Sequence, residues 1–102
     1  MTHTTKETFQ KDVLDSTVPV LVDFWASWCA PCRMQGTILE KYEASVEGKA
    51  KIVKVNVDEQ PELAQQFGVM SIPTLVVMQN GKVKTQITGV TQEPGLNKML
   101  GL

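Results

Sequence analysis

The chain has 102 residues, and its ten basic and eleven acidic side chains leave a net charge of −1, so neither nucleic acid nor an acidic membrane surface is expected as a partner. A chain of this length forms one domain, residues 1–102, with a single core of sheet and helices. The hydrophobic fraction of 42% suits an ordinary globular protein, and no apolar stretch is long enough to cross a membrane.

The chain is predicted to begin with a short helix and a buried strand. Thr8 is placed to cap the helix, and the residues before it show only a weak strand pattern. The apolar positions of this helix are Phe9, Val13 and Leu14. Residues 20–25 are apolar on both alternating faces apart from Asp23, which indicates a central parallel strand with both faces covered.

Helix and strand then alternate again. The second helix is predicted to end at Gly48, and its apolar residues at helical spacing are Met34, Ile38, Leu39 and Tyr42. Residues 52–57 form the next strand, with valines on one face. Pro61 opens a short helix that Gly68 closes.

The last third of the chain is predicted to hold a hairpin and a final helix. Asn80-Gly81 is a strong turn signal between strands at residues 74–78 and 83–88, and Thr91 is placed to cap the helix. Strands that alternate with helices run parallel through right-handed crossovers, and the hairpin adds an antiparallel edge. We therefore predict an α/β fold with a mixed central sheet and helices on both faces.

The only two cysteines, Cys29 and Cys32, stand at a strand-to-helix junction. Positions three apart share one face of a helix, so the two sulfurs can reach bonding distance without moving the backbone. A helix start supplies unpaired N–H groups and a partial positive charge, both of which favour a thiolate, and Cys29 lies nearer to it. Open α/β sheets carry their binding sites beyond the carboxyl ends of their strands, and Cys29 lies at such a place. The pattern predicts a dithiol that closes to a disulfide and reopens.

Other interpretations of the cysteine pair stay open. A structural disulfide around a loop of about four residues contributes only roughly 2 kcal/mol, and disulfide-stabilised secreted domains carry several bridges. A zinc site needs four ligands, and only His3 adds a soft one, whereas two thiolates can hold Cu(I). A structural disulfide and a copper carrier are thus the alternatives to redox chemistry, for which no metal is expected.

Four segments together resemble the thioredoxin family, in order and spacing, from about Phe9 to the C-terminal helix. The segments are VDFWASWCAPC at 22–32, VNVD at 55–58, SIPTL at 71–75 and NGK at 80–82. A lone Cys-x-x-Cys motif is weak evidence, but its combination with an acid in a buried strand and a distant Ile-Pro-Thr is specific. The resemblance implies the thioredoxin-like fold and a cytoplasmic reductase of protein disulfides.

The resemblance also implies a role for each site residue. Cys29 would attack the substrate disulfide, Cys32 would resolve the mixed disulfide, Asp23 would be a buried acid/base beneath the pair, and Lys54 would modulate Asp23. Pro73 would be a cis-proline beside the sulfurs, with the backbone of Ile72 open to an extended substrate. The implied substrate-binding positions are Trp28, Ala30, Pro31, Ile72, Pro73, Gly89 and Val90.

The implied partners are a thioredoxin reductase as electron donor and diverse disulfide-containing proteins as substrates, with a monomer and no bound cofactor. Residues 1–7 lack the apolar core of a signal peptide, so the expected location is the cytoplasm, where thiols are kept reduced. Two rival functions of the same fold are a disulfide-forming oxidase, which predicts a secretory signal, and an accessory subunit whose cysteines are dispensable.

The residues themselves support part of this assignment. Burial raises the pKa of a carboxyl, so Asp23 in an apolar strand can exchange a proton near neutral pH; the alternative is a solvent-facing residue at a strand end. Lys54 is either its neighbour or an exposed lysine on the sheet rim. The chain departs from the family at Ala30, usually Gly, and at Gly36-Thr37, where a helix proline is common. Without that proline we predict a continuous helix. Met70-Ser71 is a further departure, at the approach to Pro73.

Overall fold

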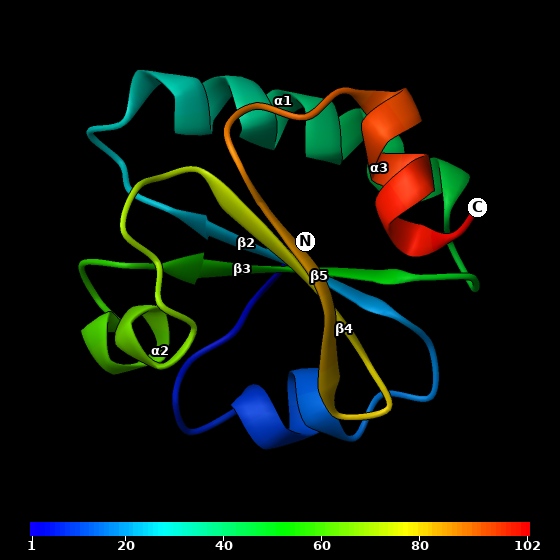
Figure 1. Ribbon diagram of the computed structural model, residues 1–102, viewed down its shortest axis with the longest axis horizontal. Coiled ribbons are helices and arrows are strands. Elements are labelled where there is room, and N and C mark those ends of the chain that lie inside the picture. Colours follow the sequence, from blue (N-terminus) through cyan, green and yellow to red (C-terminus); the bar gives the residue numbers. More distant parts are fainter.

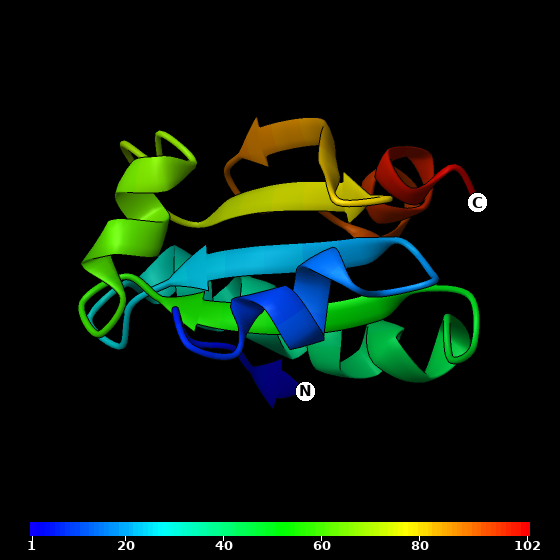
Figure 2. The ribbon, with the colours of Figure 1, turned by 90° about the horizontal axis from the view of Figure 1, so that it is seen from below.

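A five-stranded mixed sheet runs through the middle of the computed structural model, which describes residues 1–102 (Figure 1). The strands lie in the order β1-β3-β2-β4-β5. Figure 2 shows this order from bottom to top, with β1 lowest and β5 uppermost. Their bounds are β1 Thr2–His3, β2 Val20–Trp25, β3 Lys51–Asn56, β4 Thr74–Gln79 and β5 Lys82–Thr88. Strand β3 pairs in parallel with β1 and β2, whereas β4 runs antiparallel to both β2 and β5. The predicted mixed sheet is confirmed.

Helices cover both faces of this sheet. The helical elements are the π-helix η1 (Gln10–Leu14) and the α-helices α1 (Ala30–Ser45), α2 (Pro61–Gln66) and α3 (Glu93–Leu100). Helices α1 and α3 lie on one face, and η1 and α2 lie on the other (Figure 1). Each face closes over its own apolar cluster because the strand side chains alternate between the two sides.

Two predicted helix caps are wrong. The Thr5 N–H donates to Thr8 Oγ1 (2.9 Å) and the Thr8 N–H donates to Thr5 Oγ1 (3.3 Å), and the hydroxyl of Thr8 makes no capping bond to the backbone of η1. At the other end of the chain, Gln92 occupies the cap position of α3 without a side-chain bond. Thr91 instead donates its N–H to the side chain of Gln35. The hydroxyl of each threonine is engaged elsewhere: that of Thr8 accepts from Thr5, and that of Thr91 donates to the carbonyl of Gly89 (3.3 Å).

Helix α1 is continuous over 16 residues, as predicted from the absence of the helix proline (Figure 1). Gly36 and Thr37 keep the N–H groups that a proline would remove. The hydroxyl of Thr37 donates to the carbonyl of Arg33 (3.2 Å), one turn back along the same helix. The active-site end of α1 is therefore joined to the rest of the helix without a break.

Candidate active site

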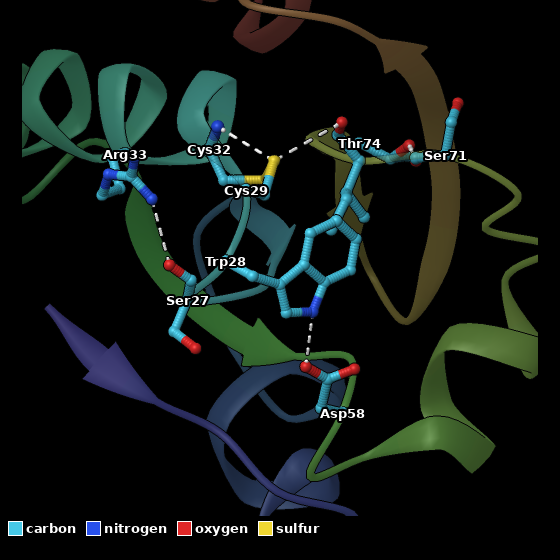
Figure 3. The surroundings of a disulfide bond; sticks show 9 residues. Ser27, Trp28, Cys29, Cys32, Arg33, Asp58, Ser71 and Thr74 are labelled. Atoms are coloured by element: carbon cyan, nitrogen blue, oxygen red, sulfur yellow. Dashed lines mark hydrogen bonds between the residues drawn. A yellow bond between two sulfur atoms is a disulfide. The ribbon is translucent and has the colours of Figure 1, made fainter.

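The two cysteines form a disulfide where β2 leads into α1 (Figure 3). Cys29 has extended backbone and occupies the cap position of α1, and Pro31 lies in the first turn, where its missing N–H leaves no bond unmade. The Cys32 N–H donates to Cys29 Sγ (3.2 Å). The sulfur of Cys29 is thus aimed at the positive end of the helix dipole, an arrangement that stabilises a thiolate when the disulfide is reduced.

Both cysteines are largely covered, and Cys29 is the more accessible of the two. The exposed fraction is 5% for Cys29 and 1% for Cys32. Around them pack Ala26, Trp25, Val57 and Ile72. The arrangement agrees with an attacking role for Cys29 and a resolving role for Cys32, because an incoming sulfur meets Cys29 first.

The loop before β4 lies against the cysteine pair. The Ile72–Pro73 peptide bond is cis, as the resemblance implied. The carbonyl oxygen of Ile72 lies 3.8 Å from Cys29 Sγ. The carbonyl of Pro73 accepts the N–H of Gly89 (2.8 Å), which brings the segment after β5 to the same end of the sheet. Three predicted site segments, distant in sequence, therefore converge.

Trp28 projects into solvent beside the disulfide, with 68% of its surface exposed. Its Nε1–H donates to Asp58 Oδ2 (2.8 Å), which fixes the ring against the loop after β3 (Figure 3). On the other side of this turn, Arg33 Nη1 donates to the carbonyl of Ser27 (3.1 Å). An exposed but anchored indole offers apolar surface to a partner at a low conformational cost.

A mainly apolar groove of about 600 Å³ opens next to Cys29. Its lining comes from the cysteine turn, from the residue that follows β3, from α2, and from the loop before Pro73: Trp28, Cys29, Ala30, Pro31, Val57, Ala64, Val69, Met70, Ser71 and Ile72. Gly89 and Val90 lie outside this lining. Sequence reasoning missed Val57, Ala64 and Val69, because ordinary apolar residues become a binding wall only through their neighbours. Met70, noted as a departure from the family, is 95% exposed at the groove.

Asp23 is fully buried, and neither carboxylate oxygen has a hydrogen-bond partner. Burial raises the pKa of Asp23 to about 7, and the positive charge of Lys54 pulls it down to a smaller extent. The interpretation of Asp23 as a solvent-facing residue is therefore wrong. The acid is placed to change protonation near neutral pH.

Lys54 lies beside Asp23 in the register of β2 and β3. Its Nζ sits 4.4 Å from the centre of the Trp25 ring, a cation–π contact, and close to the backbone of Gly36 on α1. Lys54 is half-buried between the sheet and helix α1, so the interpretation as an exposed lysine on the sheet rim is wrong. His3 packs edge-on against the same Trp25 ring, with the ring centres 6.1 Å apart.

No group of three or more His, Cys, Asp or Glu side chains is arranged to hold a metal ion. None of the helices combines the length and apolar character needed to cross a bilayer. Sequence reasoning also missed Gln35, a fully buried amide of α1 that bonds the backbone of Thr91. A glutamine in the pattern of a helix carries no signal of such a distant partner.

Comparison with known proteins places these features in one family. The family model described as Thioredoxin matches residues 1–101. The chain is 47% identical over 96 residues to Thioredoxin 1 of Nostoc sp., covering 94% of this chain and 90% of the relative. It is 52% identical over 85 residues to a thioredoxin of Chlorobaculum thiosulfatiphilum, covering 83% and 79%. A thioredoxin of Synechocystis sp. is 46% identical over 92 residues, covering 90% and 86%.

Proposed function

Because the chain belongs to the thioredoxin family, whose members act as oxidoreductases on disulfides, we propose a cycle in which Cys29 attacks and Cys32 resolves, with electrons from a thioredoxin reductase. The observation that carries it is the disulfide at the start of α1, with Cys29 open to an apolar groove. The substrates are diverse proteins that contain disulfides, held by backbone and apolar contacts.

The first step transfers the substrate to Cys29. The Cys29 thiolate forms a bond to one substrate sulfur, the substrate S–S bond breaks, and the other substrate sulfur leaves as a thiolate that takes a proton. The N–H of Cys32 and the dipole of α1 favour the thiolate of Cys29 before this attack. The product is a mixed disulfide between Cys29 and the substrate.

The second step releases the reduced substrate. Cys32 gives up its proton and bonds to Cys29 Sγ, the mixed S–S bond breaks, and two electrons have passed from the cysteine pair to the substrate. We assign the acceptance of that proton to Asp23, because its pKa of about 7 allows it to be ionised before the transfer and neutral after it. Lys54 tunes Asp23 by keeping this pKa from rising further.

We assign substrate binding to the turn that holds the cysteines and to the loops that lie next to it. Trp28, Ala30 and Pro31 form one wall and Ile72 the other, with its backbone available to an extended segment. Gly89 and Val90 continue the surface beyond Pro73. We further propose that the protein works as a monomer in the cytoplasm, which sedimentation of the purified protein and cell fractionation test.

The proposal is tested by serine substitution of each cysteine, using insulin as the disulfide substrate and a thioredoxin reductase with NADPH as the electron source. Cys29→Ser should abolish reduction, whereas Cys32→Ser should accumulate mixed disulfides that a non-reducing gel resolves. The double variant Cys29→Ser/Cys32→Ser is the control for folding and for binding without chemistry. Trapping by Cys29→Ser and none by Cys32→Ser would reverse the two roles. If the double variant still binds its partner proteins and replaces the wild type in cells, the protein would instead be an accessory subunit whose cysteines are dispensable.

A further inference from the structure

Gln35 connects the cysteine helix to the segment between β5 and α3. Its Nε2 donates to the carbonyl of Thr91 (3.0 Å), and its Oε1 accepts the N–H of Thr91 (2.7 Å). One side-chain amide thus pairs with both backbone groups of one residue, in the way a neighbouring strand would. The two residues lie 56 positions apart in sequence, and the side chain of Gln35 is 0% exposed.

The segment that Gln35 holds is residues 89–91, which includes two of the proposed substrate-binding positions. At its first residue, the Gly89 N–H donates to the carbonyl of Pro73 (2.8 Å). At its last residue, Thr91 is held by Gln35, and Thr91 Oγ1 also donates to the carbonyl of Gly89 (3.3 Å). Val90 is the residue between these two attachments, and it is half-buried. The position of Val90 is therefore set from both sides.

Gln35 stands three residues after Cys32, on the same side of α1. Its hydrogen bonds consequently fix the distance between the cysteine turn and the segment 89–91. An apolar side chain of equal volume would fill the same space without the cost of burying an amide. An apolar side chain cannot make directional hydrogen bonds, so it would not fix the orientation of Thr91. It would also leave the N–H and C=O of Thr91 without these partners.

We infer that Gln35, one helical turn from Cys32, is a positioning residue for substrate binding: it holds the segment 89–91 in place as the continuation of the protein-disulfide site beyond Pro73. This inference rests on the proposed role of Gly89 and Val90 in binding substrates. The hydrogen bonds of the Gln35 side chain go to the backbone of Thr91 and not to the cysteine sulfurs. Its loss therefore affects the affinity for a protein substrate and leaves the chemistry of the cysteines unchanged.

The test compares Gln35→Met, which keeps the volume and removes both hydrogen bonds, with the wild type on two substrates. The substrates are insulin and the small aryl disulfide DTNB, which needs no extended binding surface. We expect KM for insulin to rise about 5- to 30-fold, the factor that corresponds to roughly 1–2 kcal/mol, with kcat within twofold. The rate with DTNB should stay within twofold, and hydrogen exchange at the Thr91 amide should become faster.

Tyr42→Phe is the matched control, because it removes another hydrogen bond between α1 and the C-terminal part of the chain, from the Tyr42 hydroxyl to Asn97 Oδ1 (2.5 Å). It should lower stability without changing KM for insulin. If Tyr42→Phe raises KM as much as Gln35→Met does, the effect is general destabilisation and the inference is wrong. Gln35→Leu serves as a second apolar variant, and failure of both variants to fold would make Gln35 a core residue and also overturn the inference.

Val90→Ala separates this inference from the function on which it rests. An unchanged KM in Gln35→Met, together with a raised KM in Val90→Ala, overturns the role of Gln35 alone. An unchanged KM in both variants also removes the segment 89–91 from the binding surface. A wild-type protein that reduces neither insulin nor DTNB would instead contradict the proposed function itself.

Discussion

Two carboxylates are buried in this protein, one on each side of the sheet, and their surroundings act on them in opposite directions. Asp12, in η1, has a lowered pKa: burial alone would raise it, but hydrogen bonds from Thr8 and Thr4 and the positive charge of Lys51 more than offset burial. Asp23, in β2, has no hydrogen-bond partner, and burial raises its pKa to about 7. The difference shows that partners, and not depth alone, decide the charge state of a buried acid.

A related contrast separates the two sides of strand β2. Toward η1 and α2, β2 presents Val22 and Phe24 to a cluster that is otherwise apolar. Toward α1, the same strand presents the buried carboxyl of Asp23. Helix α1 places the buried amide of Gln35 on this side of the sheet. Toward η1 and α2 the strand itself contributes only apolar side chains, and the acid on that side, Asp12, belongs to η1 and has hydrogen-bonding and charged neighbours. The side that faces α1 carries these polar groups next to the helix that bears the cysteines. Their burial costs free energy of folding, and the roles proposed for them in the reaction and in substrate binding account for that cost.

The largest expected effect comes from breaking the apolar face. Phe24→Ala removes a fully buried ring that lies 5.7 Å, centre to centre, from the ring of Phe67. We expect the free energy of unfolding to fall by about 3–5 kcal/mol, through lost transfer energy and the cavity left behind. Urea unfolding measures it. The loss should be the same at pH 5 and pH 9, because no titrating group is involved, and a pH-dependent loss would contradict the assignment of this face.

Asp23→Asn should stabilise the protein at high pH. The folded pKa of about 7 lies above the ordinary value of 3.8 for this carboxyl, so the unfolded chain releases its proton first as the pH rises. The wild type therefore loses stability between about pH 4 and pH 7, up to about 4 kcal/mol at 1.36 kcal/mol per pKa unit. The variant should lack this loss.

Urea unfolding of the oxidised protein from pH 4 to pH 9 measures the difference between wild type and Asp23→Asn. The two curves should meet near pH 4 and diverge above it. The variant should also slow the resolving step, because Cys32 loses a proton acceptor. Parallel curves over the whole range would show that Asp23 titrates at an ordinary value.

Asp12→Asn should have a smaller effect of the opposite sign. Because the folded pKa of Asp12 is lowered, the unfolded chain binds the proton more tightly, and the ionised form stabilises the fold above about pH 4. We expect a loss of about 1 kcal/mol at neutral pH, the usual size for a hydrogen-bonded group. This loss should disappear in acid, as the carboxylate of the wild type is protonated. A gain in stability at pH 7 would contradict the contrast between the two acids.

Gly36→Ala should give the smallest effect, a gain of about 0.5–1 kcal/mol. Gly36 lies inside α1, where alanine is the better helix former. A Cβ at this position would lie 3.4 Å from Lys54 Nζ, the flexible end of a long side chain that can move aside. Thermal unfolding measures the gain. Destabilisation would mean that Lys54 cannot move, and hence that its position over Trp25 is held firmly.

The sequence by itself determined the elements whose signals are local. The apolar run of β2, the helical spacing in α1 and the Asn80-Gly81 turn each lie within one window of the chain, and the structure has an element at each. The cysteine pair is local as well, since a spacing of three across a helix start brings the sulfurs together. The cis bond before Pro73 followed from the family resemblance, not from local physics.

Only the tertiary structure decided which polar groups meet. The capping expectations for Thr8 and Thr91 failed because the two hydroxyls bond to Thr5 and Gly89 instead, and the backbone of Thr91 is held by Gln35 from 56 residues away. The groove wall formed by Val57 and Ala64, and the opposite pKa shifts of Asp12 and Asp23, also depend on which segments pack together. Hydrogen bonding and desolvation depend on what packs against a group in space, and a single chain segment does not contain that information.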